Sequence, residues 1–193
     1  MTVQIARHLF TTSEYEKMVS AGILTENDKV ELLNGGIVEM TPIGSAHASC
    51  VKRLNHLLVQ KVGSRAIVGV QDPVWLDEQS MPEPDLSLVA PRGDYYVDAH
   101  PGPDEILLLI EVADTTLEFD RSVKLPLYAR AGTPEMWLVD LNAGCVEVHN
   151  MARGGSFRQM RLYNRGDMLE TSVQILSSVA VVDILGPLEE DRP

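Results

Sequence analysis

Apolar residues recur along the chain with the period of strands in some segments and of helices in others. The run at 106–110 is entirely apolar and is followed by Glu111, which predicts a strand buried on both faces. Shorter strands are predicted at 83–89 and 135–140. A loop rich in Pro and Gly is predicted at 91–103, after the first of these strands.

Two helices are predicted in the first third of the chain. Thr11 and Glu14 have the spacing of a capping box, and Gly22 follows where a short helix would end. Ser45 is expected to cap a second helix, because apolar residues recur after it at three- and four-residue intervals as far as Val62.

A third helix is predicted at 121–131, with Gly132 as its end. Pro126 lies inside this segment and has no backbone N–H to donate. The helix is therefore expected to begin at about Ser122, which keeps Pro126 near the first turn, where a proline costs least.

Hairpins and short strands are predicted near both ends of the chain. Residues 29–33 and 37–40 flank Asn34 and two glycines, which tolerate the positive φ of tight hairpin turns. Further strands are predicted at 67–76, 145–149 and 157–163 and in short pieces within 173–185. The C-terminal third is therefore expected to be mostly strand.

The chain of 193 residues fits one domain, expected to comprise an ordered core at about 9–185 and a charged tail at 187–193. Cys50 and Cys145 have no metal-binding spacing, which favours free thiols in a reducing compartment. No signal-peptide pattern opens the chain, and no apolar run approaches the ~18 residues of a membrane span. We therefore expect a cytoplasmic protein without a membrane segment.

The formal net charge of −12 argues against a protein that holds nucleic acid by bulk electrostatics, since such binding depends on Lys and Arg. It does not exclude a nuclease, because a metal site built from carboxylates adds negative charge locally. One positive rim is possible from the basic residues Lys52, Arg53, Lys61, Arg65, Arg121 and Arg130.

Three charged residues lie where charge is hard to explain structurally, namely Asp85, Glu111 and Lys124. Asp85 and Glu111 would meet at one end of the sheet if their strands are neighbours, and two carboxylates suit magnesium, which prefers oxygen ligands. A nearby lysine could position water or offset charge on phosphorus. The residues alone leave a plainer alternative open, because acidic residues at strand ends are common and helical lysines are usually solvated.

These residues belong to a series of motifs that together resemble the Uma-two family of PD-(D/E)XK, or restriction-endonuclease-like, nucleases. The resemblance covers about residues 9–185. The matching segments are 31–35 with 39–40, His47 before its helix, 84–86, 110–113, 120–125, 128–129, Gly132 and 137–140.

The resemblance implies an α/β (α+β) fold, a mixed sheet flanked by helices, with additional N- and C-terminal strands. It implies that Asp85 and Glu111 bind magnesium, with manganese as a substitute, and that Lys124 is catalytic. It further implies Glu31 as a third acidic group and His47 as an extra metal ligand or phosphate contact. DNA as substrate and a homodimer are also expected.

The sequence departs from the superfamily signature at two positions. Ala113 occupies the place of the signature lysine, so the lysine role must pass to Lys124 on the following helix. A lysine can reach the same space from there, because its long stem carries a point charge. Pro126 follows Lys124 closely and is able to tilt the turn that holds it.

Three functions remain open at this point. The first is a metal-dependent DNA endonuclease that hydrolyses phosphodiester bonds by water attack. The second is a catalytically silent nuclease-like module that binds a protein or nucleic-acid partner, which Ala113 and the acidic composition favour. The third is a glycoside hydrolase with a carboxylate pair, a mechanism that has no use for Lys124.

Overall fold

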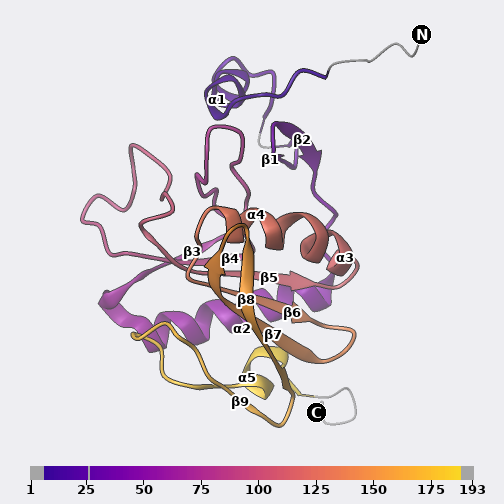
Figure 1. The fold of residues 1–193 in the computed structure, drawn as a ribbon, viewed down its shortest axis with the longest axis vertical. Helices are drawn as coiled ribbons and strands as arrows, with labels where there is room; N and C mark the ends of the chain where they lie inside the picture. Colours follow the sequence, from indigo (N-terminus) through magenta and orange to yellow (C-terminus); the bar gives the residue numbers. More distant parts are fainter. Residues whose placement is uncertain (1–6, 26, 188–193) are drawn as a thin grey trace.

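The structure, a computed structural model, describes residues 7–25 and 27–187 and is built around a six-stranded sheet (Figure 1). The strands run in the order β3-β4-β5-β6-β7-β8, and only β5 and β6 are parallel neighbours in this sheet. Their bounds are β3 (Ile67–Val70), β4 (Leu86–Val89), β5 (Ile106–Ala113), β6 (Glu135–Asp140), β7 (Cys145–Arg153) and β8 (Ser156–Asn164). The sheet is therefore mixed, as predicted.

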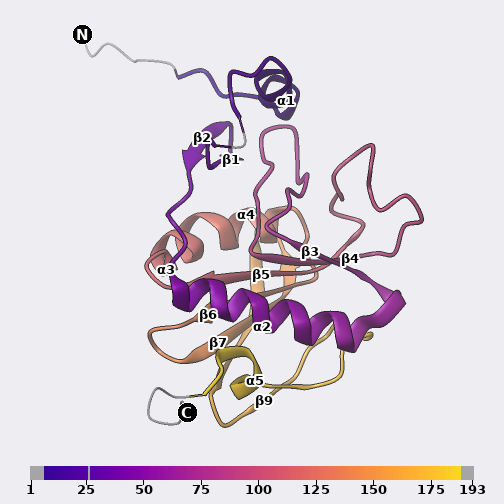
Figure 2. The same ribbon diagram turned by 180° about the vertical axis from the view of Figure 1, so that it is seen from behind.

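Helices cover both faces of this sheet (Figures 1 and 2). The long helix α2 lies with the short helix α5 on one face, and the segment from α3 to α4 lies on the other. The bounds are α2 (Ser45–Val62), the 3-10 turn η1 (Gly63–Arg65), α3 (Leu117–Phe119), the π-helical turn η2 (Asp120–Lys124), α4 (Leu125–Arg130) and α5 (Val181–Leu185).

Strand β5 is buried on both faces because its apolar residues serve both cores. Ile110 and Val112 pack in the core under α2, whereas Leu109 and Ala113 pack in the core under α4. Successive side chains of a strand point to opposite faces, so Glu111 faces the α4 side. A carboxylate is thereby placed in an apolar layer, where it needs partners.

The N-terminal elements form a separate layer beyond one end of the sheet, as Figure 2 shows. They are α1 (Thr12–Ser20) and the hairpin of β1 (Val30–Leu33) and β2 (Gly36–Glu39). Thr11 and Glu14 form the predicted capping box, and Asn34 and Gly35 take φ of 50° and 76° in the hairpin turn. These predictions are confirmed.

Several predicted boundaries are wrong. Ser45 does not cap α2; Gly44 does, without a side-chain hydrogen bond. The strand predicted at 67–76 ends at Val70, because Gln71 turns into the left-handed region with φ of 54°. The strand predicted at 83–89 is regular only over β4, since prolines at its start cannot donate to a neighbouring strand.

The helix predicted to begin at Ser122 begins earlier, at Leu117, and contains the π-helical turn η2. In this turn the N–H of Leu125 donates to the carbonyl of Asp120, five residues back rather than four. Pro126 follows at the start of α4. The π-helical turn therefore precedes the proline directly. Pro126 has no N–H and would interrupt the backbone hydrogen bonds of a continuous α-helix.

The segment predicted as short strands at 173–185 is partly helical. Strand β9 (Met168–Leu169) pairs with β10 (Val179–Ala180), and helix α5 follows directly. Val181 and Ile184 of α5 pack in the core under α2. The residues 188–193 of the predicted tail lie outside the described part of the chain. Among the residues described, none of the helices is long and apolar enough to span a membrane.

Candidate active site

Asp85 and Glu111 lie side by side at one end of the sheet, as their predicted strand pairing requires. Strands β4 and β5 are antiparallel neighbours with Leu86 opposite Ile110, so Asp85 comes level with Glu111. The Asp85 carboxylate accepts a hydrogen bond of 2.8 Å from the N–H of Val112. This bond holds the Asp85 side chain against β5.

His47, in the first turn of α2, contacts Asp85 directly. Its Nε2 lies 2.9 Å from Oδ2 of Asp85, and because an ionised carboxylate only accepts, Nε2 donates. This hydrogen bond raises the pKa of His47, although burial opposes the shift. Nδ1 of His47 is buried without a partner among the described residues. His47 therefore orients Asp85; its predicted role as a metal ligand stays a prediction.

Glu111 is buried beneath the π-helical turn, with only 3% of its surface exposed. Burial raises its pKa to about 8, against the attraction of Lys124 and with a contribution from Asp85. Its Oε1 accepts hydrogen bonds from Nζ of Lys124 at 3.1 Å and from the hydroxyl of Tyr128 at 2.5 Å. Burial therefore makes this carboxyl group harder to ionise in the metal-free protein than in water.

Lys124 ends the π-helical turn and is almost completely buried between two glutamates. Its Nζ lies 3.1 Å from Glu111 and 3.2 Å from Glu31. Burial by itself lowers the pKa of Lys124, but these carboxylates outweigh burial and raise it above its usual value. Lys124 is thus a buried cation at the proposed site, and the alternative of a solvated helix lysine is wrong.

Glu31 brings the N-terminal hairpin to the site. It lies in β1, is 3% exposed, and its Oε2 accepts a hydrogen bond of 3.1 Å from the N–H of Glu83 as well as the contact from Lys124. The segment that leads into β4 and the turn that holds Lys124 are therefore joined through one carboxylate. The structure thus brings Glu31 together with Lys124; its role as a third acidic group of the active site stays a prediction.

Three residues at the site were missed by the sequence predictions. Tyr128 lies one helical turn after Lys124, in a segment that was matched to the family without a role being assigned to the tyrosine. Asp120 is buried, which raises its pKa, and it accepts a hydrogen bond of 2.8 Å from Thr116. Gln71 places its side-chain amide 3.4 Å from Oδ1 of Asp85.

Ala113 occupies the signature position of the lysine and is completely buried. It lies two residues after Glu111 in β5 and so on the same face, in the core that includes Leu127 and Tyr128. A small residue there leaves room for α4 to pack on the sheet. Lys124 reaches Glu111 from the helix side of this core, whereas a lysine at position 113 would have to enter it.

The two carboxylates fit magnesium better than they fit a transition metal. Oxygen donors from one or two carboxylates, completed by water and phosphate, are the usual protein contribution to a magnesium site. Among the residues described, no group of three or more His, Cys, Asp or Glu side chains is placed to hold a metal. Oε2 of Glu111 also receives no hydrogen bond from that part of the chain and remains available as a ligand.

The predicted positive rim is not formed as one surface. The basic residues of α2 lie on the α2 side of the sheet, where Arg53 donates to the backbone carbonyls of Ile184 and Leu185. Arg121, on the α4 side, is bound to the buried carboxylate of Glu147. Arg130, at the end of α4, is the residue of the predicted rim that is exposed on the same face of the sheet as Lys124.

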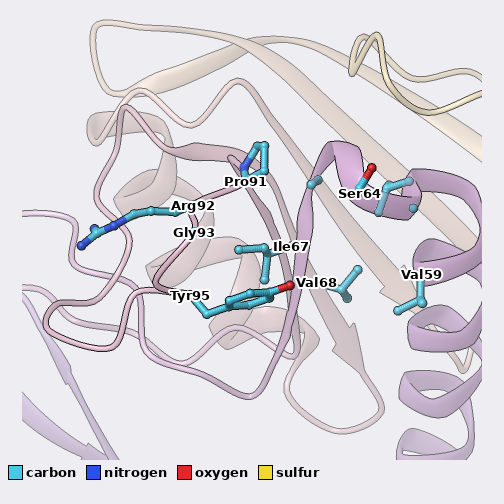
Figure 3. A pocket seen from close by; sticks show the side chains of 11 residues that line it. Val59, Ser64, Ile67, Val68, Pro91, Arg92, Gly93 and Tyr95 are labelled. Carbon is cyan, nitrogen blue, oxygen red and sulfur yellow. The ribbon is translucent and has the colours of Figure 1, made fainter.

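A pocket of about 520 Å³ lies away from these residues (Figure 3). It is formed where the end of α2 and the start of β3 meet the loop after β4, and its lining includes Val59, Ile67 and Tyr95. No residue of the candidate site lines this pocket. The lining is mostly apolar, and its one charged side chain, Arg92, is paired with Asp94.

The family model Uma2, described as "Putative restriction endonuclease", matches residues 12–180 of the chain. No curated protein matches it. The fold is similar to that of "a putative nuclease belonging to DUF820" from Anabaena variabilis ATCC 29413, with a TM-score of 0.68 and 13% sequence identity. That alignment covers 91% of this chain and 97% of the other, which confirms the predicted fold class. Because the family model spans most of its length, the chain belongs to the Uma2 family.

Proposed function

We propose that the protein is a DNA endonuclease that hydrolyses phosphodiester bonds with the help of a divalent cation. The observation that carries this proposal is the buried Lys124. Its Nζ lies 3.1 Å from Oε1 of Glu111, and Asp85 lies level with Glu111 at the start of the neighbouring strand. Burying a cation costs free energy of folding unless the cation is paired with a carboxylate. Apolar residues in its place would stabilise the fold at least as well, so a buried ion pair is not needed for a purely structural role. Family membership supports the same conclusion.

Asp85 and Glu111 would hold the cation, with magnesium as the expected metal and manganese as a substitute. When bound, the cation would supply Lewis-acid stabilisation of charge on the phosphate and activate the attacking water. His47 holds Asp85 through Oδ2, and Tyr128 holds Glu111 through Oε1. Both carboxylates are therefore fixed before a ligand arrives.

Lys124 supplies the positive charge at this site. Its ammonium group forms ion pairs with two carboxylates and carries three protons, which it could also donate to a phosphate oxygen or a water molecule. Charge that develops on the phosphate in the transition state would be stabilised by this fixed cation. Glu31 keeps the ammonium group in place and needs no contact with substrate.

The test is cleavage of plasmid DNA in magnesium by the parent and by Lys124→Ala. Loss of one such group lowers rates by about 10²–10³. Manganese affinity, measured by calorimetry, should persist in this variant, because Lys124 is not a ligand, and should be lost in Asp85→Asn. Lys52→Ala removes an exposed lysine of α2 and serves as the control. Parental cleavage by Lys124→Ala would overturn the proposal.

The second candidate is a nuclease-like module that binds without cutting, favoured by Ala113 in the signature position. A titration with manganese distinguishes the two functions. A silent module would show no saturable manganese binding that depends on Asp85. The glycoside hydrolase loses support, because the buried charge of Lys124 has no role in a carboxylate-pair mechanism.

A further inference from the structure

We propose that Arg130, Arg153 and Arg158 form a surface that binds the phosphate backbone of DNA beside the active site. We call these three residues the arginine surface. The inference rests on the proposed nuclease function and assigns it a substrate-holding face. It depends on three observations: the arginines gather at one turn, they lack carboxylate partners, and they lie close to Lys124.

The three arginines meet at the turn between β7 and β8. Arg153 ends β7, and Gly154 and Gly155 follow with φ of 61° and 78°. A Cβ built on Gly155 would lie 3.0 Å from Cγ of Arg130, so the arginine stem of α4 crosses the turn there. A Cβ built on Gly154 would lie 3.7 Å from Nη2 of Arg158.

Their charge is not neutralised within the protein. Among the residues described, no carboxylate oxygen lies within 4.0 Å of the arginine surface, whereas Arg92, Arg121 and Arg161 are each paired with a carboxylate. All three members are exposed. On a chain of net charge −12, an exposed group of unpaired guanidinium ions is a local exception. Guanidinium groups match phosphate oxygens in geometry and charge.

Strand β1 and helix α4 fix the position of this surface relative to the active site. Glu31 contacts Lys124, and three residues later Asn34 accepts a hydrogen bond of 2.6 Å from Arg130. Three strand residues span about 10 Å. The six helical residues from Lys124 to Arg130 span about 9 Å. Both spans place Arg130 about 10 Å from Lys124.

A separation of about 10 Å suits one DNA strand. The backbone winds round the duplex axis, so successive phosphates of one strand lie further apart than the axial rise of about 3.4 Å per nucleotide. A phosphate one or two nucleotides from the one at Lys124 would therefore reach Arg130. The hairpin turn continues the positive surface from there through Arg153 and Arg158. Asp77 and Glu78, exposed in the loop beside Asn34, would bound this surface on that side.

The test compares DNA binding by the parent and by the triple variant Arg130→Gln, Arg153→Gln, Arg158→Gln. Affinity for a short duplex is measured in EDTA, which prevents cleavage, over a range of salt concentrations. The slope of log K against log [salt] should fall by about one unit for each arginine that contacts a phosphate. Affinity at low salt should fall at least about tenfold.

A matched control is Arg7→Gln, Lys17→Gln, Lys52→Gln, which removes three exposed positive charges elsewhere and gives the same net charge. It should bind DNA nearly as the parent does. The conservative variant with lysine at all three positions of the arginine surface should keep most of the salt dependence. Thermal unfolding of each variant checks the fold.

The outcomes separate this inference from the proposed function. If the parent binds and cuts DNA while the triple glutamine variant and the control behave alike, the arginine surface is wrong and the nuclease stands. If the parent neither binds nor cuts DNA, both proposals fall. The expected result is weaker, less salt-dependent binding by the glutamine variant alone.

Discussion

Glu111 shows at the scale of one residue how the fold controls charge. Burial raises its pKa to about 8 from an ordinary value of 4.5, although Lys124 lies beside it. In the metal-free protein the folded chain therefore binds more protons than the unfolded chain between these two values. The contribution of Glu111 to the free energy of unfolding therefore falls as the pH rises through that range, because ionisation of this group is easier in the unfolded chain.

Glu111→Gln should remove this pH dependence. Glutamine keeps the acceptor used by Lys124 and Tyr128 but does not ionise, so the metal-free variant should gain stability over the parent as the pH rises from about 5 to 8. The gain is at most about 1.4 kcal/mol per pH unit. Urea unfolding in EDTA at several pH values measures it, with the exposed Glu118→Gln as control. A gap between Glu111→Gln and the parent that does not change with pH would contradict the pKa.

The residues of the site were predictable to different degrees. Asp85, Glu111 and Lys124 were identified through family motifs, and the structure places Glu111 against Lys124 and Asp85 on the neighbouring strand. The burial of Lys124 was not predictable, because it depends on Glu31 arriving from a distant hairpin. Tyr128 was missed since its ring belongs to the core pattern and only its hydroxyl reaches the site.

The ends of elements, rather than the elements themselves, were hard to predict. Apolar periodicity found the six sheet strands and α2, because the buried stripe of each element is recorded locally in the sequence. Strand β3 nevertheless ends at Val70, because the next residue, Gln71, has a φ of 54°, which is uncommon for residues other than Gly, Asn, Asp and His. Tertiary contacts decide this conformation: the N–H of Gln71 donates to the carbonyl of Asp85.

Gln71 should therefore reveal strain at the end of β3. Gln71→Gly and Gln71→Ala both delete the amide near Asp85, but only glycine adopts positive φ without a steric cost. The alanine variant should be less stable than the glycine variant by about 1 kcal/mol. Urea unfolding compares the two. Equal stability would show that the backbone at position 71 is relaxed.

At the scale of the whole molecule, the site is a product of the complete fold. Its residues come from the N-terminal hairpin, the start of α2, two sheet strands and the helical segment over them. The C-terminal third, by contrast, contributes the outer strands of the sheet. Edge strand β8 is nine residues long and exposes Met160 and Leu162, which is an unusual liability for a lone chain.

We expect a homodimer that covers such an edge. Sedimentation at micromolar concentration should give the mass of two chains. Leu162→Glu, which places a charge on β8, should shift the equilibrium towards monomer, whereas Val182→Glu, on exposed surface of α5, should not. Monomer alone in the parent would contradict the expectation, and a dimer that resists Leu162→Glu would place the contact elsewhere.

The π-helical turn before Pro126 makes chain length, and not only residue identity, a determinant of this protein. A π-turn holds one residue more than an α-turn, so it is equivalent to a single inserted residue that was absorbed without breaking the helix. Loss of one residue there would rotate the preceding helix by about 100° relative to α4. Related chains that differ by one residue in this segment would then present a different side chain to Glu111, and an alignment without a gap would pair the wrong residue with Lys124.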